Sequence, residues 1–323
     1  SGRYLMDISN FSNIYQAFGQ RTKKIEDYHG SDTGIVVRTA LNDLTTKRLE
    51  EKEKVNAVAA APIVVKFRIP GSELFNTVMS LDKSIYLGEV IQLRLTFLEK
   101  DSIGFWADNN VDFANAVTAT GAITLTDFNF FLAQEQNPAV VNDLIQTVST
   151  TGMSVVIPYV HSYKTVGTAQ DTAVSIRLSR GHGQSCERIY TIPINGAEAW
   201  GSRYVADAST LTSFYSLLDS RRLQEFDVLC GTTRDYDWLR AHEKKDRVVS
   251  LSEVENDTKN FAWSDSWCAD LECAINQHVG GLSLDVERKY DVYFKSTLAD
   301  VKFYTAVICQ KMLTMGPGGV DVM

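Results

Sequence analysis

An alternation of apolar and polar residues with a period of two recurs along this chain of 323 residues and limits what it can fold into. In residues 63–69 (IVVKFRI) the odd-numbered positions are all apolar, whereas Lys66 and Arg68 lie between them. Residues 91–97 (IQLRLTF) repeat the pattern. Because successive side chains of a strand point to opposite faces, the pattern predicts two half-buried strands that pair in one sheet.

Further strands are expected in residues 123–132, 153–160, 173–179, 187–194, 282–286, 290–294 and 301–312. In the first of these the apolar phase changes near Asp127, which predicts a bulge. Pro158 and Pro193 cannot donate to a ladder, so parts of their strands are expected at sheet edges or bends. Short alternating strands of this kind are typical of antiparallel sandwiches rather than of βαβ folds. The predicted fold class is therefore all-β.

Few helices are expected, and the clearest spans residues 138–148. Asn137 is a suitable N-cap, and Pro138 can occupy the first helical position because the missing N–H has no partner there in any case. The buried stripe of this helix is expected to contain Val140, Leu144 and Val148. Three other helices are predicted, in residues 11–28, 209–224 and near 267–278.

The length of the chain and a short internal repeat together favour two tandem domains. A chain of 323 residues suits two domains of about 150 residues, each large enough for its own core. A helix, a glycine turn and a strand occur around Gly152 and recur around Gly280, about 130 residues later. We therefore expect two jelly-roll sandwiches: residues 1–180, with a polar and partly helical stretch in 1–60, and residues 181–323.

The charge pattern argues against a broad nucleic-acid surface. The net charge is −8, and basic residues alternate with acids, as in residues 47–54 (KRLEEKEK), whereas phosphate binding needs clustered cations. No apolar run reaches the roughly 18 residues of a membrane span. Residues 1–6 lack the basic and apolar regions of a secretory signal, so a processed or truncated start is expected.

The cysteines are odd in number and scattered, at Cys186, Cys230, Cys268, Cys273 and Cys309. In a chain of this size that distribution favours buried free thiols, made in a reducing compartment, over a disulfide framework. Cys268 and Cys273 lie five positions apart, and both are expected to be buried as small apolar residues rather than to bind a ligand.

No group of residues predicts a catalytic, cofactor or metal site. In residues 181–186 (GHGQSC), His182 and Cys186 have the spacing of a metal pair, but no second pair completes a zinc site, so a tight turn between the two sandwiches is expected. Residues 316–320 (GPGGV) predict a turn and a flexible tail. An acidic stretch with one histidine is expected to be a solvated loop; it contains Asp235, Asp237, His242 and Glu243.

Common enzyme signatures such as the P-loop and the nucleophile elbow do not occur. Glycosidase carboxylates leave no local signature, however, so the sequence leaves that class open.

The order of several segments resembles that of double jelly-roll major capsid proteins, the family of virophage, Polinton-like and adenovirus hexon-type capsid proteins. The segments are Phe67–Pro70, Val90–Leu95, Ile123–Leu132, Gly152–Tyr163, Arg180–Gly183, Arg188–Tyr190, Gly280–Leu284, Val307 and Gly318–Val320. The similarity covers roughly residues 60–320 and rests on strand patterns rather than on an invariant signature. Family members often carry more strands before the segment that corresponds to residues 63–97.

The resemblance implies a structural protein without catalytic residues or cofactors. Three copies would form a trimeric, pseudo-hexagonal capsomer that tiles an icosahedral shell in the virion. The implied partners are other capsomers, penton and minor capsid proteins, and an inner membrane where one lies beneath the shell; sequence-specific nucleic-acid binding is not implied. Loops in residues 195–210 and 231–260 would then clasp neighbouring subunits or form an outer tower.

The main alternative is a carbohydrate-binding or carbohydrate-active β-sandwich. Tryptophan side chains can stack on sugars, although they are also common in cores and interfaces. The five candidates are Trp106, Trp200, Trp238, Trp263 and Trp267. A third reading, a minor capsid or penton protein with one jelly roll, is disfavoured because the strand pattern continues past residue 180.

Overall fold

The computed structural model describes nine stretches of the chain: residues 78–80, 84–86, 92–96, 126–167, 171–194, 211–229, 263–267, 280–296 and 301–323. Within them lie a short 3₁₀ helix η3 (Val78–Ser80), one α-helix and eleven strands. Among these residues, no helix is long and apolar enough to cross a membrane. The expected all-β class is confirmed for the described part of the chain.

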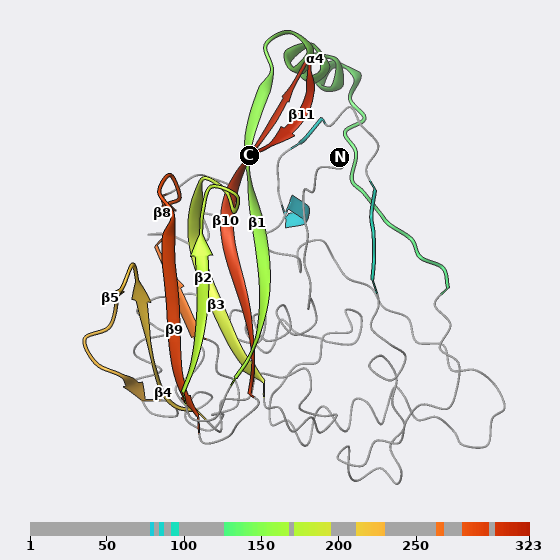
Figure 1. Cartoon of the computed structure of the whole chain (residues 1–323). Coiled ribbons are helices and arrows are strands. Elements are labelled where there is room, and N and C mark those ends of the chain that lie inside the picture. Colours follow the sequence, from blue (N-terminus) through green and yellow to red (C-terminus); the bar gives the residue numbers. More distant parts are fainter. Residues whose placement is uncertain are drawn as a thin grey trace, which may run out of the picture.

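The strands form two antiparallel sheets (Figure 1). The first, named here the β10 sheet, has the order β1-β10-β3-β7, with β11 paired to β10 and β8 to β3. Its strands are β1 (Met153–Val166), β3 (Ser185–Ile194), β7 (Trp263–Ser266), β8 (Leu282–Ser283), β10 (Lys302–Gly316) and β11 (Gly319–Val322). The second, named the β9 sheet, has the order β2-β9-β4-β5, with β6 paired to β4. Its strands are β2 (Asp171–Leu178), β4 (Leu211–Leu218), β5 (Arg221–Arg222), β6 (Val228–Leu229) and β9 (Arg288–Ser296).

The connections between these strands identify the fold. The chain passes from one sheet to the other between β1 and β2, β2 and β3, and β3 and β4, and it does so again between β6 and β7, β8 and β9, and β9 and β10. As a result, first and last strands pair, as β1 does with β10 over fourteen residues and β2 does with β9. Two antiparallel layers connected in this way, here of six and five strands, form a jelly roll.

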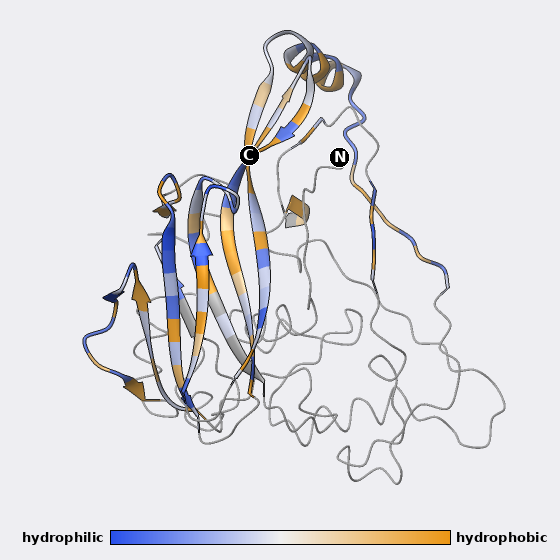
Figure 2. Ribbon diagram, viewed as in Figure 1, coloured by the Kyte–Doolittle hydropathy of each residue, from blue (hydrophilic) through white to orange (hydrophobic). Residues whose placement is uncertain are grey.

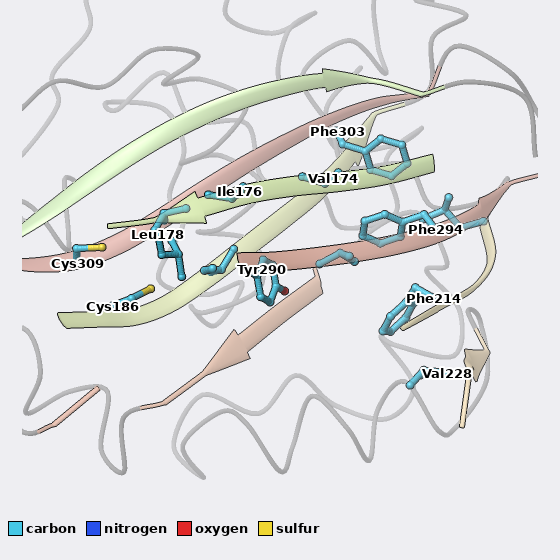
Figure 3. Close-up of a cluster of buried hydrophobic side chains, with 14 of the residues drawn as sticks. Val174, Ile176, Leu178, Cys186, Phe214, Val228, Tyr290, Phe294, Phe303 and Cys309 are labelled. Atoms are coloured by element: carbon cyan, nitrogen blue, oxygen red, sulfur yellow. The ribbon is translucent and has the colours of Figure 1, made fainter. Parts of the chain in front are cut away.

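The core lies between the two sheets (Figure 3). In β2 every second side chain is buried, which places Val174, Ile176 and Leu178 in the core and the residues between them in solvent. On β9, the neighbour of β2 in the same sheet, the ring of Phe294 stacks on that of Phe303 of β10 at 4.6 Å. This contact joins the two sheets. Burying such side chains contributes about 2 kcal/mol each.

Helix α4 (Pro138–Thr150) and the β10–β11 hairpin close a second apolar cluster beyond the sandwich (Figure 1). The Asn137 side chain accepts a hydrogen bond from the Ala139 N–H at 3.1 Å, and Pro138 occupies the first turn, as expected. Val148 is buried and Leu144 half-buried, but Val140 is 45% exposed, so the buried stripe is narrower than predicted.

Most strands predicted after residue 150 are confirmed. β1, β3 and β9 contain the expected segments, and β2 and β10 contain all but one terminal residue of theirs, whereas β8 comprises only Leu282 and Ser283. Pro158 lies on β1, which is an edge strand of the β10 sheet, and Pro193 lies beyond the four residues of β3 that pair with β7. At neither proline does a second neighbouring strand among the described residues require a backbone N–H, which proline lacks.

The helix expected in residues 209–224 is wrong, because this segment forms β4, a tight turn and β5. Seven residues of β4 align with β9, and its Phe214 enters the core beside Phe294. The turn at Asp219 and Ser220 has positive φ values of 51° and 68°, which an α-helix cannot accommodate. Pairing with β9 thus decides the structure of a segment whose apolar spacing also suits a helix.

Two other expected strands are not formed where the structure describes them. Residues 126–132 pair with no strand among the described residues, and Phe131 is 89% exposed. Asp127, where a bulge was expected, has a φ of 56°, so the backbone does change direction there. Residues 92–96 likewise lack a strand, and residues 63–69 lie outside the described part. The helices expected in 11–28 and near 267–278 also fall on residues that are not described, apart from Trp267.

The domain boundary expected between residues 180 and 181 needs correction. β1 and β2 precede it, yet they pair with β10 and β9, so the boundary would cut through the sandwich. Most of residues 1–150 lie outside the described part, and a second sandwich there stays a prediction. The tail expected after residue 316 is also different: β10 turns at Pro317 and Gly318 and returns as β11, which makes a hairpin.

Candidate functional site

The turn between β2 and β3 contains the histidine that the sequence singled out. His182 N–H donates to the Ser179 carbonyl at 2.9 Å, and Gly183 N–H donates to the Arg180 carbonyl at 3.2 Å. The expected tight turn is confirmed, but it joins the two sheets of one sandwich rather than two sandwiches. Gly183 has a φ of 146°, and a Cβ there would lie 2.4 Å from the carbonyl oxygen of Gln310, so only glycine fits.

His182 is the centre of a hydrogen-bonded cluster with two residues of β1. Its Nε2 lies 2.5 Å from the Tyr163 hydroxyl, and its carbonyl lies 3.0 Å from Nε2 of His161. The two imidazole rings meet edge to face at 4.7 Å. Burial holds the pKa of His182 below its ordinary value and raises the pKa of Tyr163. A neutral imidazole is therefore the resident form at neutral pH.

Lys311 adds a cation to the same end of the sandwich. Its Nζ lies 3.8 Å from the centre of the Tyr159 ring, which is a cation–π distance. Burial lowers the pKa of Lys311, and the charge of Lys311 in turn lowers the pKa of His182. The cluster of Tyr159, His161, Tyr163, His182 and Lys311 thus joins β1, β10 and the β2–β3 turn. Tyr163 and His161 were missed by sequence reasoning, because only the fold brings them to His182.

Cys186 does not join His182, because it lies within the core opposite Cys309. Both cysteines are buried, as the sequence predicted for them. No group of three or more histidine, cysteine or acidic residues in the described stretches could hold a metal ion. Cys230, Cys268 and Cys273, together with the acidic residues of 235–243, lie outside those stretches.

Both faces of the β10 sheet are buried along its central strand. Phe303, Val307 and Cys309 point into the core between the sheets. The alternate residues Tyr304, Ala306 and Ile308 must point to the outer face, yet they are only 6%, 3% and 4% exposed. On the neighbouring β1, Val160 is aligned with Ile308 and is also buried. An apolar buried surface therefore covers the outer side of this sheet.

A buried carboxyl group lies on that outer face. The register between β3 and β10 shifts between Ile308 and Cys309, which leaves Glu187 as the extra residue of a bulge. Its carboxylate accepts a hydrogen bond from the side-chain amide of Gln310, which is itself buried. Burial raises the pKa of Glu187 to about 7, against the lowering effects of Gln310 and Arg188.

The outer face of the β9 sheet has the opposite character. Hydrophilic and hydrophobic residues follow one another along β2 and β9 (Figure 2). Polar and charged residues alternate there with core residues, and Lys289 pairs with Asp291 at 3.0 Å. Tyr215 and Tyr293 stack at 5.0 Å, and the guanidinium of Arg222 lies 4.4 Å from the Tyr215 ring. One sheet of the sandwich therefore faces solvent, while the other is buried on both sides.

The tryptophans proposed as sugar platforms can be placed only in part. Trp267 packs against the core and meets the Tyr290 ring at 84° and 5.9 Å, so its ring already has an aromatic partner. Trp263 lies on β7. The other three, Trp106, Trp200 and Trp238, lie outside the described residues.

No protein-family model and no curated protein matches the chain. Solved structures with partial similarity are viral major capsid proteins. The PBCV-1 virus capsid model is 10% identical, with a TM-score of 0.37 over 56% of this chain and 54% of that one. The Faustovirus major capsid protein is 10% identical, with a TM-score of 0.39 over 56% and 36%. The major capsid protein P2 of bacteriophage PM2 is 8% identical, with a TM-score of 0.30 over 51% and 47%. The chain thus spans about half or less of the length of each.

Proposed function

We propose that this protein is a structural subunit of a viral capsid, a major capsid protein built from two tandem jelly rolls. Three copies would form a pseudo-hexagonal capsomer of an icosahedral shell. The observation that carries the proposal is a complete jelly roll in which one sheet faces solvent and the other is buried on both faces.

A sandwich that stands alone needs only one buried face in each sheet, since its outer faces can meet water. Tyr304, Ala306 and Ile308 would then be exposed, and an exposed apolar patch of this kind marks an interaction surface. Their burial supports a second body packed against the β10 sheet. Residues 1–150 are long enough for that body to be a sandwich of similar size.

The jelly roll occurs in capsid and lectin domains and in cupins, so the fold alone leaves a choice. A double sandwich with one polar outer face suits a building block that packs side by side with copies of itself. The inward packing of Trp267 weakens the sugar-stacking alternative for that residue. The subunit role that we propose involves no catalysis and no cofactor.

Several finer features belong to the same proposal. We place the protein in the virion and its synthesis in a reducing compartment. Its partners would be further copies of the capsomer and penton and minor capsid proteins. With a net charge of −8, contact with the genome would not rely on a broad basic surface.

The mass of the purified chain in solution tests the proposal. Light scattering coupled to size exclusion should give about three times the 36.0 kDa of one chain, and negative-stain images should show a hexagonal outline. A monomer that persists at concentrations of tens of micromolar and shows no such outline would overturn the capsomer. Titration with glycans, followed by tryptophan fluorescence, should leave the spectrum unchanged.

A further inference from the structure

Cys186 and Cys309 face each other across the two central strands of the β10 sheet. They are aligned partners in the antiparallel pairing of β3 with β10. Both side chains are fully buried in the core, and their sulfur atoms lie on the same side of the sheet (Figure 3). The two residues come from distant parts of the chain, so the fold alone brings them together.

Cys186 and Cys309 stay aligned partners directly beside the bulge at Glu187, so the spacing of a regular ladder is the guide to their separation. Directly opposed residues of antiparallel strands have Cα atoms about 4.5–5.5 Å apart. A disulfide needs about 4.4–6.8 Å between the same atoms. The thiol of Cys186 now makes a weak contact with the Arg188 carbonyl at 3.9 Å. Bond formation would require side-chain rotation at Cys186 and a local adjustment of the strands at the bulge.

Two short segments lie next to the pair, which is itself fully buried. At Cys186, β3 is paired on one edge only with the two-residue strand β8, which follows Gly280 and Gly281. At Cys309, the β2–β3 turn lies close, since a Cβ on Gly183 would come within 3.3 Å of the Cys309 Cβ. Short strands and glycine turns are segments that open locally at low free energy. Local opening of these segments would give a small reagent access to the two buried thiols.

We propose that Cys186 and Cys309 form a disulfide across β3 and β10 when the folded protein meets a small-molecule disulfide such as glutathione disulfide. One cysteine thiolate attacks the oxidant and releases a first molecule of small thiol. The second cysteine thiolate then attacks the mixed disulfide and releases another. The two protein thiols are oxidised, the oxidant's S–S bond breaks, and two small thiols carry away the protons and electrons.

The disulfide would fasten the two strands that hold the sheet together. Because it closes a long loop, it restricts the unfolded chain and so favours the folded state. The sandwich would be most stable in oxidising surroundings and would loosen on reduction. The proposal concerns the jelly roll itself and stands whether or not the protein assembles into a capsid.

Oxidation of the full chain, purified under reducing conditions, tests the pair directly. After exposure to glutathione disulfide, free thiols are blocked under denaturing conditions and the digest is analysed by mass spectrometry. We expect a peptide pair linked through Cys186 and Cys309, and a rise of several degrees in the thermal midpoint that a reductant reverses. Cys186→Val and Cys309→Val should abolish the rise, whereas the matched control Cys230→Val should retain it.

Far-UV circular dichroism of the reduced variants shows that each still folds. If either valine variant does not fold, the linked peptide of the wild-type chain remains the decisive result. Absence of that peptide from folded protein would overturn the proposal. So would a predominant link from Cys186 to Cys230, Cys268 or Cys273.

Discussion

The Tyr163 hydroxyl lies 2.5 Å from Nε2 of His182 and ties the first strand of the sandwich to the β2–β3 turn. On the other side of the ring, the Ser179 N–H donates to Nδ1 at 3.3 Å. Since Nδ1 accepts, the neutral imidazole carries its proton on Nε2 and donates it to Tyr163. A second proton would have to go to Nδ1, where it would face the Ser179 N–H.

Acid is therefore expected to weaken the fold through His182. Its folded pKa lies below the unfolded value of 6.5, so the unfolded chain binds more protons. The stability that the neutral ring provides is complete above pH 6.5 and is lost as the pH falls through the folded pKa. Denaturant titrations between about pH 5 and pH 8 should show this loss of stability. In the His182→Gln variant, the free energy of unfolding should depend less on pH.

NMR titration gives a direct check on the same group. The His182 ring protons should titrate below 6.5, and Tyr163→Phe, which removes the hydroxyl partner, should shift that midpoint. The Tyr293→Phe variant is a suitable control, since that tyrosine stacks on Tyr215 on the outer face of the β9 sheet. A His182 midpoint above 6.5 would contradict the assigned neutral form.

Glu187 is expected to give the opposite dependence on pH. Burial raises its pKa from 4.5 to about 7, so the folded chain holds the proton more tightly. The contribution of the protonated Glu187 to the free energy of unfolding is complete below pH 4.5 and is lost as the pH rises through 7. Glu187→Gln keeps an acceptor for Gln310 without the charge, and it should stabilise the protein at pH 8 by up to about 3 kcal/mol.

Urea unfolding at two pH values isolates this effect from that of His182. Below pH 4.5 the Glu187→Gln variant should approach the wild type, because Glu187 is then largely neutral in both the folded and the unfolded chain. Glu287→Gln is the control, since that carboxylate is exposed and pairs only loosely with Arg177 at 3.6 Å. Equal stability of the wild type and Glu187→Gln at pH 8 would rule out a buried charge at this site.

Gly183→Ala should destabilise the sandwich by at least about 2 kcal/mol, because the residue has a positive φ and no room for a side chain. Gly181→Ala, two residues earlier in the same turn, is the matched control. A Cβ there would lie 3.6 Å from the Ser179 Oγ, which is ordinary contact. Thermal unfolding of the two variants should differ clearly, and equal midpoints would show that the turn can rearrange.

The strands around residues 153–178 and 288–316 could be predicted because their periodicity follows directly from burial. In β2, for example, Val174, Ile176 and Leu178 enter the core, and the residues between them meet solvent. The segment at 211–218 misled the prediction because Leu211, Phe214, Tyr215 and Leu218 also fit one face of a helix. Its pairing with β9, about 75 residues away, decided the outcome, and local propensity does not contain that information.

The candidate site was less predictable than the strands. His161 and Tyr163 lie on one face of a strand by their spacing, but their meeting with His182 depends on a crossing between the sheets. The Gly181–Gly183 turn looks like a linker in sequence, because glycines mark chain reversals within and between domains alike. Burial of Tyr304, Ala306 and Ile308 was equally hidden, since a strand buried on both faces shows no clear alternation.

Ala306 provides the sharpest test of the doubly buried sheet. Ala306 is 3% exposed on the outer face of β10. Ala306→Asp would therefore bury a carboxylate among apolar side chains at a position where the protein has an alanine and no need for a polar partner. We expect a loss of at least about 3 kcal/mol in the free energy of unfolding, measured by denaturant titration. Ala173→Asp, on the exposed face of β2, should change the stability by less than about 0.5 kcal/mol. If both variants behave alike, the outer face of the β10 sheet is open to water in solution, and the packing of a second body against it is wrong.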